Sequence, residues 1–219
     1  MRRQPSTRLA ILAVAACVPA SAGAHGSGYG GSGGGGSVYI EQVGDQQSAR
    51  VDQSAPRSSV VIRQEGDRNR VEVEQKGLAP MSAAILQQGG RNRAEAQQWG
   101  GANSVAIGQS GRGNQATASQ LGGLFSSNSA SLSQSGDGNR MALRQAGEGN
   151  SADLSQDGDR NAMSANQVGL GASLSWSQTG TALPDLGITQ IGRSALSITQ
   201  SWGVNAAGAP VMVVTGLPK

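Results

Sequence analysis

The segment that decides the fold is residues 104–120, which read SVAIGQSGRGNQATASQ. Val105, Ile107 and Gln109 alternate with small or polar residues, and alternation with a period of two is typical of a β-strand with one buried face. A turn containing Gly and Asn follows, and a second alternating run ends in Gln120, eleven residues after the first Gln. The segment therefore predicts a strand, a turn and a second strand, each closed by a Gln.

The same unit recurs along most of the chain. Of the 21 Gln in the sequence, 15 mark the repeat, and eleven residues separate most neighbours. The repeat Gln are Gln42, Gln53, Gln64, Gln75, Gln87, Gln98, Gln109, Gln120, Gln134, Gln145, Gln156, Gln167, Gln178, Gln190 and Gln200. One residue is inserted before Gln87, three before Gln134 and one before Gln190, and one is deleted before Gln200. Repeats of this kind point to a stacked architecture.

Gly and Asn mark the turns between the strands, because both residues accept left-handed backbone geometry at low cost. A Gly stands two residues after the Gln in 13 units: Gly44, Gly66, Gly77, Gly89, Gly100, Gly111, Gly122, Gly136, Gly147, Gly158, Gly169, Gly180 and Gly192. An Asn stands five residues after it in seven units: Asn69, Asn92, Asn103, Asn114, Asn139, Asn150 and Asn161.

The candidate core consists of the residues two and four places before each repeat Gln. All thirty are apolar, from Val38 and Ile40 to Leu196 and Ile198, and Leu186 is among them. An eleven-residue repeat can also indicate a right-handed helical coil. The alternation excludes that reading, and so does the Gly in nearly every unit, which would cost a helix about 1 kcal/mol each time.

One short strand cannot enclose a core, so the units must stack. Two units per coil give an all-β, two-sheet β-solenoid of about 22 residues per coil and about 15 short strands, with an amyloid-like arrangement. The inward Gln and Asn recur in register, so each is expected to bond its own copy in the coils above and below as an amide ladder. The first coil, from Val38, and the last, near Gln200, are expected to leave strand edges unpaired.

The N-terminus predicts export. Residues 1–24 combine Arg2, Arg3 and Arg8 with an apolar run of about ten residues and a small-residue exit, as in a secretory signal peptide cleaved after Ala22 or Ala24. This segment holds three of the 17 basic residues and no acid, so 14 basic and 14 acidic residues follow it. The overall positive charge therefore does not indicate a nucleic-acid partner.

A lipoprotein signal is the alternative at this end, because residues 14–17 read VAAC and would leave Cys17 as a lipid anchor. Beyond residue 24, the composition divides the chain into a flexible Gly-rich leader (25–37), the repeat region (38–203) and a tail or cap (204–219). The leader matches a dinucleotide-binding fingerprint by its letters alone, without the flanking strand and helix that give the fingerprint meaning.

Catalytic, cofactor-binding and metal-binding residues are not predicted. The chain has one His, His25, and one Cys, so a His/Cys cluster is excluded. The charged turn residues are expected to form a solvated face that also discourages unwanted sheet pairing. They are Asp45, Asp67, Arg68, Arg91, Arg112, Asp137, Glu148, Asp159, Arg160 and Arg193. Calcium binding by the four Asp among them is a weaker alternative.

Residues 104–120 also resemble the curlin repeat of the curli amyloid subunits, in which a Ser precedes Gln-x-Gly-x-x-Asn-x-Ala-x3-Gln. Residues 59–75 and 129–145 read similarly, and the resemblance covers residues 38–203. It implies extracellular amyloid fibres for biofilm matrix and surface adhesion. It also implies a second curlin-repeat subunit and a dedicated outer-membrane secretion channel, to which residues 25–37 would be presented. The leader favours the major fibre subunit over the minor nucleator.

Two further function classes stay open beside the fibre subunit. A monomeric binding solenoid could present an outer face to ice or to a glycan, although the outward positions carry mixed Ser, Arg, Glu and Asp. A glycan-cleaving β-helix enzyme would need paired carboxylates with long loops, and the sizeable loop at 122–127 contains no acid. Neither a cofactor nor a small-molecule substrate is expected.

Overall fold

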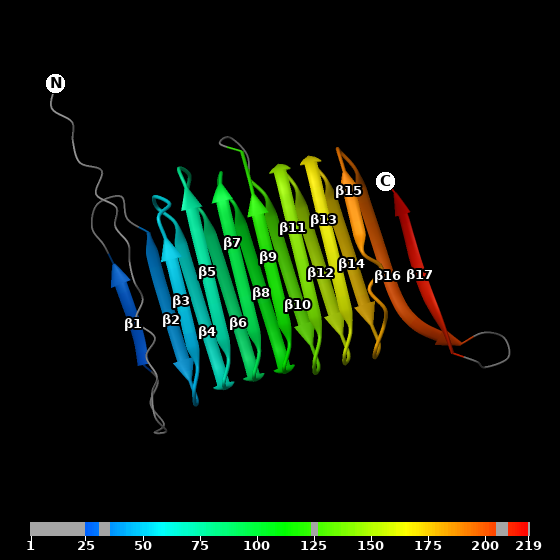
Figure 1. The fold of residues 1–219 in the computed structure, drawn as a ribbon, viewed down its shortest axis with the longest axis horizontal. Helices are drawn as coiled ribbons and strands as arrows, with labels where there is room; N and C mark the ends of the chain where they lie inside the picture. The colour runs from blue at the N-terminus through cyan, green and yellow to red at the C-terminus, as the bar shows by residue number, and fades with distance from the viewer. Residues whose placement is uncertain (1–24, 31–35, 124–126, 205–209, 219) are drawn as a thin grey trace.

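The protein is an all-β solenoid in the computed structural model, which describes residues 25–30, 36–123, 127–204 and 210–218 (Figure 1). The predicted signal peptide lies outside these residues. The strands are β1 (His25–Gly30), β2 (Ser37–Val43), β3 (Ser48–Gln53), β4 (Ser59–Asp67), β5 (Arg70–Gly77), β6 (Ser82–Gly90), β7 (Arg93–Gly100), β8 (Ser104–Arg112), β9 (Gln115–Leu121), β10 (Ser129–Ser135), β11 (Arg140–Glu148), β12 (Ser151–Asp157), β13 (Ala162–Leu170), β14 (Ser173–Thr179), β15 (Ile188–Ile191), β16 (Ala195–Val204) and β17 (Pro210–Pro218).

Two parallel sheets form the body. Sheet A has the strand order β1-β2-β4-β6-β8-β10-β12-β14-β16-β17, and sheet B has the order β15-β13-β11-β9-β7-β5-β3. The chain moves from one sheet to the other at every turn, so β2 to β16 make seven and a half coils. Aligned residues in successive coils are 22 to 25 positions apart, as in the pairs Gln87–Gln109 and Gln109–Gln134. The predicted two-sheet solenoid is confirmed.

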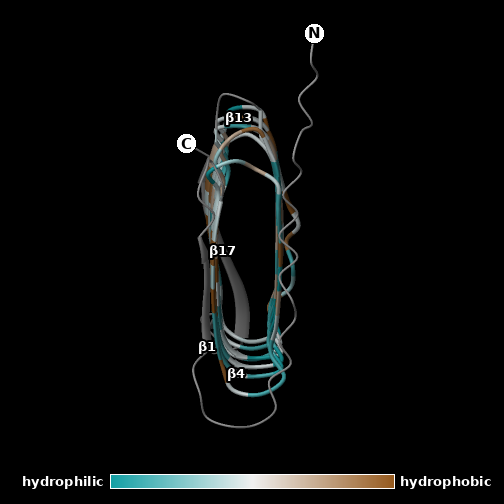
Figure 2. Ribbon diagram, turned by 90° about the vertical axis from the view of Figure 1, so that its left-hand side faces the viewer, coloured by the Kyte–Doolittle hydropathy of each residue, from teal (hydrophilic) through white to brown (hydrophobic). Residues whose placement is uncertain are grey.

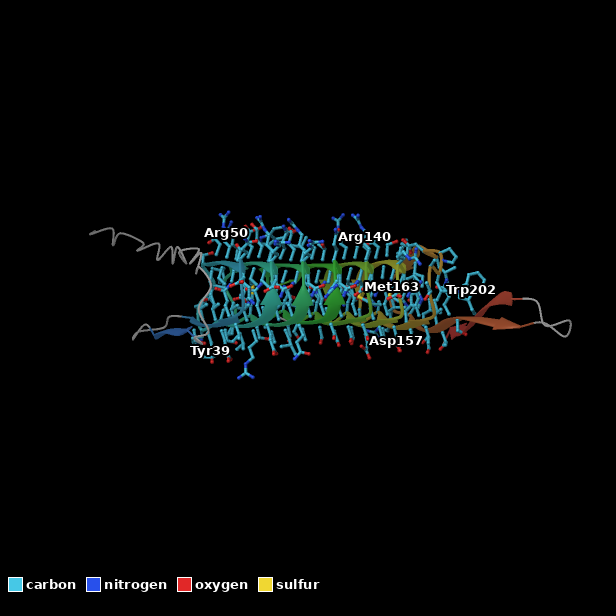
Figure 3. All side chains as sticks on the ribbon, turned by 90° about the horizontal axis from the view of Figure 1, so that it is seen from below. Tyr39, Arg50, Arg140, Asp157, Met163 and Trp202 are labelled. Atoms are coloured by element: carbon cyan, nitrogen blue, oxygen red, sulfur yellow. The ribbon has the colours of Figure 1, made fainter. Side chains whose placement is uncertain are left out.

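The core lies in the narrow space between the sheets, where the coils superimpose as a flattened ring when seen along the stack (Figure 2). Of the thirty predicted core residues, 26 form one buried cluster, and Ile40, Ile188 and Leu196 pack against it. Met163 lies between the two sheets in Figure 3. Ala and β-branched residues dominate the cluster, which suits two sheets that approach closely.

Leu186 is the exception, because 37% of its surface is exposed. The half-coil that contains it forms only the four-residue strand β15. Gly187, with φ of 57°, interrupts the extended backbone just before β15, so Leu186 lies outside the strand whose alternation would turn it inward. The prediction that Leu186 is buried was therefore wrong.

The ends of sheet A differ from the expectation of unpaired edges. Residues 25–30, predicted as a flexible leader, form β1 and pair antiparallel with β2 over six residues. The tail forms β17, which pairs antiparallel with β16 over nine residues. Edge strands carry free backbone donors and acceptors that any extended segment can satisfy, even one rich in Gly. In sheet B, β3 and β15 remain the terminal strands among the described residues.

Candidate functional site

The candidate site is the pair of Gln ladders that run along the interior, one in each sheet. In sheet A, each Nε2 donates to the Oε1 of the Gln one coil further on, over 2.6–2.9 Å from Gln42 to Gln200. In sheet B, the same bonds of 2.8–2.9 Å run from Gln53 to Gln190. All repeat Gln except Gln42 are buried. The amide ladder predicted for Gln is thus present in both sheets.

Eleven of the 15 ladder Gln also hold the two sheets together. Gln109 Nε2 donates to the Arg93 carbonyl at 3.1 Å, and Gln120 Nε2 donates to the Ser104 carbonyl at 2.9 Å. These carbonyls lie in the turn that leads into the opposite sheet or at the start of its strand. An amide has two N–H donors, so one is used along the stack and the other across it. A buried amide satisfied in this way avoids a penalty of about 1–3 kcal/mol.

The Asn residues also form a ladder from coil to coil, but through backbone groups. Asn114 Nδ2 donates to the Ser110 carbonyl at 3.0 Å and to the Gly136 carbonyl of the next coil at 2.7 Å. Its Oδ1 accepts the backbone N–H of Asn139 at 3.0 Å. The Asn side chain therefore closes its own turn and links it to the next coil through the backbone, not through a second Asn amide.

Two buried amides of the same kind were missed by the sequence pattern. Asn128 lies after the insertion at residues 122–127, of which 124–126 are outside the described residues, and it bonds the Leu121 and Gly147 carbonyls. Gln47 replaces Asn in the first coil and bonds the Val43 and Gly66 carbonyls. Counting back from the following strand, not forward from the preceding Gln, would have identified Asn128.

The turn glycines permit the close stacking of successive turns. Eleven of the 13 have positive φ, and the exceptions, Gly77 and Gly122, belong to turns that carry insertions. At Gly66, with φ of 105°, an added Cβ would lie 2.0 Å from the Gly89 carbonyl oxygen. The second left-handed position is the residue before Asn, such as Arg68 or Gly113, and not Asn itself as expected.

The acidic turn residues bond the backbone of neighbouring coils. Asp137 Oδ1 accepts the N–H of Arg112 at 2.7 Å, and Asp159 Oδ1 accepts the N–H of Asp137 at 2.8 Å. The part of the chain that the structure describes contains no group of three or more His, Cys, Asp or Glu arranged to hold a metal ion. These carboxylates thus extend the links between coils to the solvent-exposed side of the turns.

The outer face of sheet B carries ion pairs near its N-terminal end. Arg50 and Arg70 both approach Glu72, at 3.9 and 3.6 Å. Lys76 contacts Asp52 at 3.7 Å and is hydrogen-bonded to Glu74. The pKa of Lys76 is raised above its ordinary value by that hydrogen bond first, then by the charge of Glu74, and less by Asp52. Exposed pairs of this kind contribute little stability, so their main effect is a hydrated surface.

The two ladders end in different chemical groups. At the N-terminal end of sheet B, Gln53 Oε1 is buried and has no hydrogen-bond partner. At the C-terminal end, Gln190 Nε2 donates to the Ser173 carbonyl at 3.0 Å, as the Gln of other coils do across the stack. Sheet B therefore ends in an acceptor at one end and in an amide donor at the other. A bond between these two ends would run from Nε2 to Oε1, as the bonds between internal coils do.

No family model matches the chain, and no curated protein or solved structure matches it either. Among the described residues there is also no helix of the length and apolar character that crossing a membrane requires. The chemistry of the ladders and of their ends is therefore what bears on the function of this chain.

Proposed function

We propose that this chain is a secreted structural subunit that assembles by stacking coil on coil into extracellular, curli-like amyloid fibres of a biofilm matrix. Residues 1–24 direct export in this proposal, and the mature chain reaches the cell surface through a dedicated outer-membrane channel. A second curlin-repeat protein nucleates the fibres, and this chain supplies the major subunit. No catalytic step and no cofactor belongs to this function.

The observation that carries the proposal is the buried, unpartnered acceptor at Gln53, against which Gly36 lies and which a stacked copy would reach once residue 36 moves aside. Each internal coil satisfies its Gln Oε1 with the Nε2 of the preceding coil, and Gln53 lacks that donor. A second copy stacked on β3 through its own β15 would bring Gln190 Nε2 to this position. A buried acceptor without a partner costs about 1–3 kcal/mol, so the contact is favourable on this account alone.

Backbone pairing supports the same contact. Strands β3 and β15 are the ends of sheet B, and parallel strands inside the sheet pair in register through aligned Gln, as in β5 with β7. Stacking a second copy would repeat this geometry without any change in the coils. In sheet A, β1 and β17 would first have to leave β2 and β16.

Fibre formation by the mature chain tests the proposal. The chain from His25 onward, at micromolar concentration and neutral pH, is expected to form thioflavin-positive fibres after a lag, and preformed seeds should abolish the lag. Oriented fibres should diffract at about 4.7 Å along the axis and at about 10 Å across it. A chain that remains a monodisperse monomer for days in the presence of seeds would show that the proposal is wrong.

A further inference from the structure

From β6 onward, the outer face of sheet A carries fewer charged residues than the outer face of sheet B. The outward residues of β6, β8, β10, β12, β14 and β16 form what we call the hydroxyl face. Its charged residues are Asp153, Asp157 and, at the turn end of β8, Arg112, and the others are Ser and Thr with a few Ala, Gly, Leu and Gln. In sheet B, by contrast, β5 alone carries four charged outward residues. The outward Ser, Arg, Glu and Asp, a mixed set in the sequence, are thus unevenly divided between the two sheets of the folded chain.

The hydroxyl face is flat and regular. One row along the stack consists of Ser82, Ser104, Ser129, Ser151 and Ser173. Within this row, Ser82 Oγ donates to Ser104 Oγ at 2.9 Å. Figure 3 shows Asp157 pointing out from this face among short, oxygen-tipped side chains, and Arg50 and Arg140 pointing out from the opposite face. Short side chains allow another surface to approach the sheet closely.

We infer that the hydroxyl face binds the hydroxyl face of a second copy, so that two stacked filaments pair side by side with sheet B facing water. This inference rests on the proposed function. Hydroxyls are both donors and acceptors, so a hydroxyl face is chemically complementary to itself. The cores of protein interfaces are depleted of charged residues, as this face is and sheet B is not.

The size of the face explains why pairing needs the filament. Six strands about 4.8 Å apart and about 23 Å long cover about 650 Å² per copy, or about 1,300 Å² for a pair. This value lies near the lower limit of stable interfaces, about 1,200–2,000 Å². A single pair of copies is therefore weak, whereas each copy added to two stacked filaments adds another linked contact. Copies should remain unpaired before they stack and pair afterwards.

The test compares two double variants with matched exposure. S133K/S155K places two lysines on adjacent strands of the hydroxyl face, close to Asp153 and Asp157. T117K/A142K places two lysines on adjacent strands of sheet B, close to Glu95. Position 133 resembles 117 in exposure, and 155 resembles 142. Both variants and the unmodified chain are seeded identically, and mass per length and filament width are measured by electron microscopy.

We expect paired filaments from the unmodified chain and from T117K/A142K. S133K/S155K should elongate at the same seeded rate but give single filaments with about half the mass per length. Paired filaments from S133K/S155K, or single filaments from the unmodified chain, would overturn the pairing and leave the fibre function intact. Single unmodified filaments that retain cellulose through Ser133 and Ser155 would instead identify a glycan-binding face. Absence of fibres in all three chains would overturn the proposed function and the pairing together.

Discussion

At the residue scale, each buried side chain of this solenoid packs between near copies of itself. Ile107 lies between Ile85 and Leu132 in the neighbouring coils, and 2% of its surface is exposed. Its neighbour Ala106 points outward and is exposed. The period of two therefore places adjacent residues in opposite environments, and a slip of one residue would exchange them.

An aspartate at each of these two positions tests that assignment. Ile107→Asp would bury a carboxylate between two apolar coils, which costs several kcal/mol while it is charged. It should block fibre formation at neutral pH. Burial raises the pKa of such a carboxyl, so the penalty falls as the pH drops towards about 4, the ordinary value, and formation should partly recover there.

Ala106→Asp is the control for that experiment. It places the same charge on the outer surface of a single stack of coils, so it should change the stability of the coil by only about 0.5 kcal/mol and modestly alter the lag, which precedes any pairing of filaments. The measurement is fibre yield and lag under identical seeding. Equal behaviour of the two variants, or a stronger effect at position 106, would contradict the inward placement of Ile107.

At the element scale, the turn is a unit that the Asn side chain joins to the next coil. Asn114 makes three hydrogen bonds to backbone groups, so Asn114→Ala should lower the free energy of unfolding by about 3 kcal/mol. Ala172 occupies the equivalent position in a later coil, and its N–H already bonds Asn150 Oδ1. Ala172→Asn restores the missing side-chain donors and should raise the free energy of unfolding by about 1 kcal/mol.

Urea unfolding of freshly prepared monomer measures both changes. The outward neighbour Gln115→Ala is the control and should leave the midpoint within experimental error, because its side chain is exposed. If Asn114→Ala unfolds at the same urea concentration as the control, the turn bonds do not stabilise the stack.

The sequence predicted correctly those strands in which the alternation of apolar residues and the regular spacing of the Gln indicate the same register. The Gln spacing and the alternating apolar pairs predicted both sheets. They fix the register of each strand, because a shift of one residue would turn its apolar side chains outward. The failures occur where the spacing changes. Counting five residues forward from Gln190 places Ala195 at the position of the turn Asn. The one-residue deletion before Gln200 instead makes Ser194 the turn residue and pairs Ala195 with Ser173. Leu186 is exposed because the left-handed Gly187 interrupts the extended backbone before β15, which the apolar repeat pattern does not register.

At the scale of the whole molecule, β1 and β17 cover the two edges of sheet A, and in the proposed assembly we expect this cover to slow stacking. No side-chain pattern in the Gly-rich leader predicted this, because the pairing is between backbone groups. Natural proteins cover strand edges to prevent association. Removing residues 25–30, or residues 205–219, should therefore shorten the lag of fibre formation several-fold, and removing both should shorten it most.

Thioflavin kinetics of the three shortened chains, beside the chain that begins at His25, measure this effect. The rate of seeded elongation should change less than the lag, because β1 and β17 no longer pair with the edge strands at the ends of a growing fibre. An unchanged lag after both segments are removed would show that the edges of sheet A do not limit assembly.

The Gln ladders give any assembly a direction. In every coil of both sheets the Nε2 points toward the C-terminal end of the stack and the Oε1 toward the N-terminal end. The side-chain amides are thus aligned head to tail, like the peptide groups of a helix, and their dipoles add. Two like ends brought together would oppose acceptor to acceptor or donor to donor. A filament built as proposed would therefore be polar, with two chemically different ends and all its subunits facing the same way.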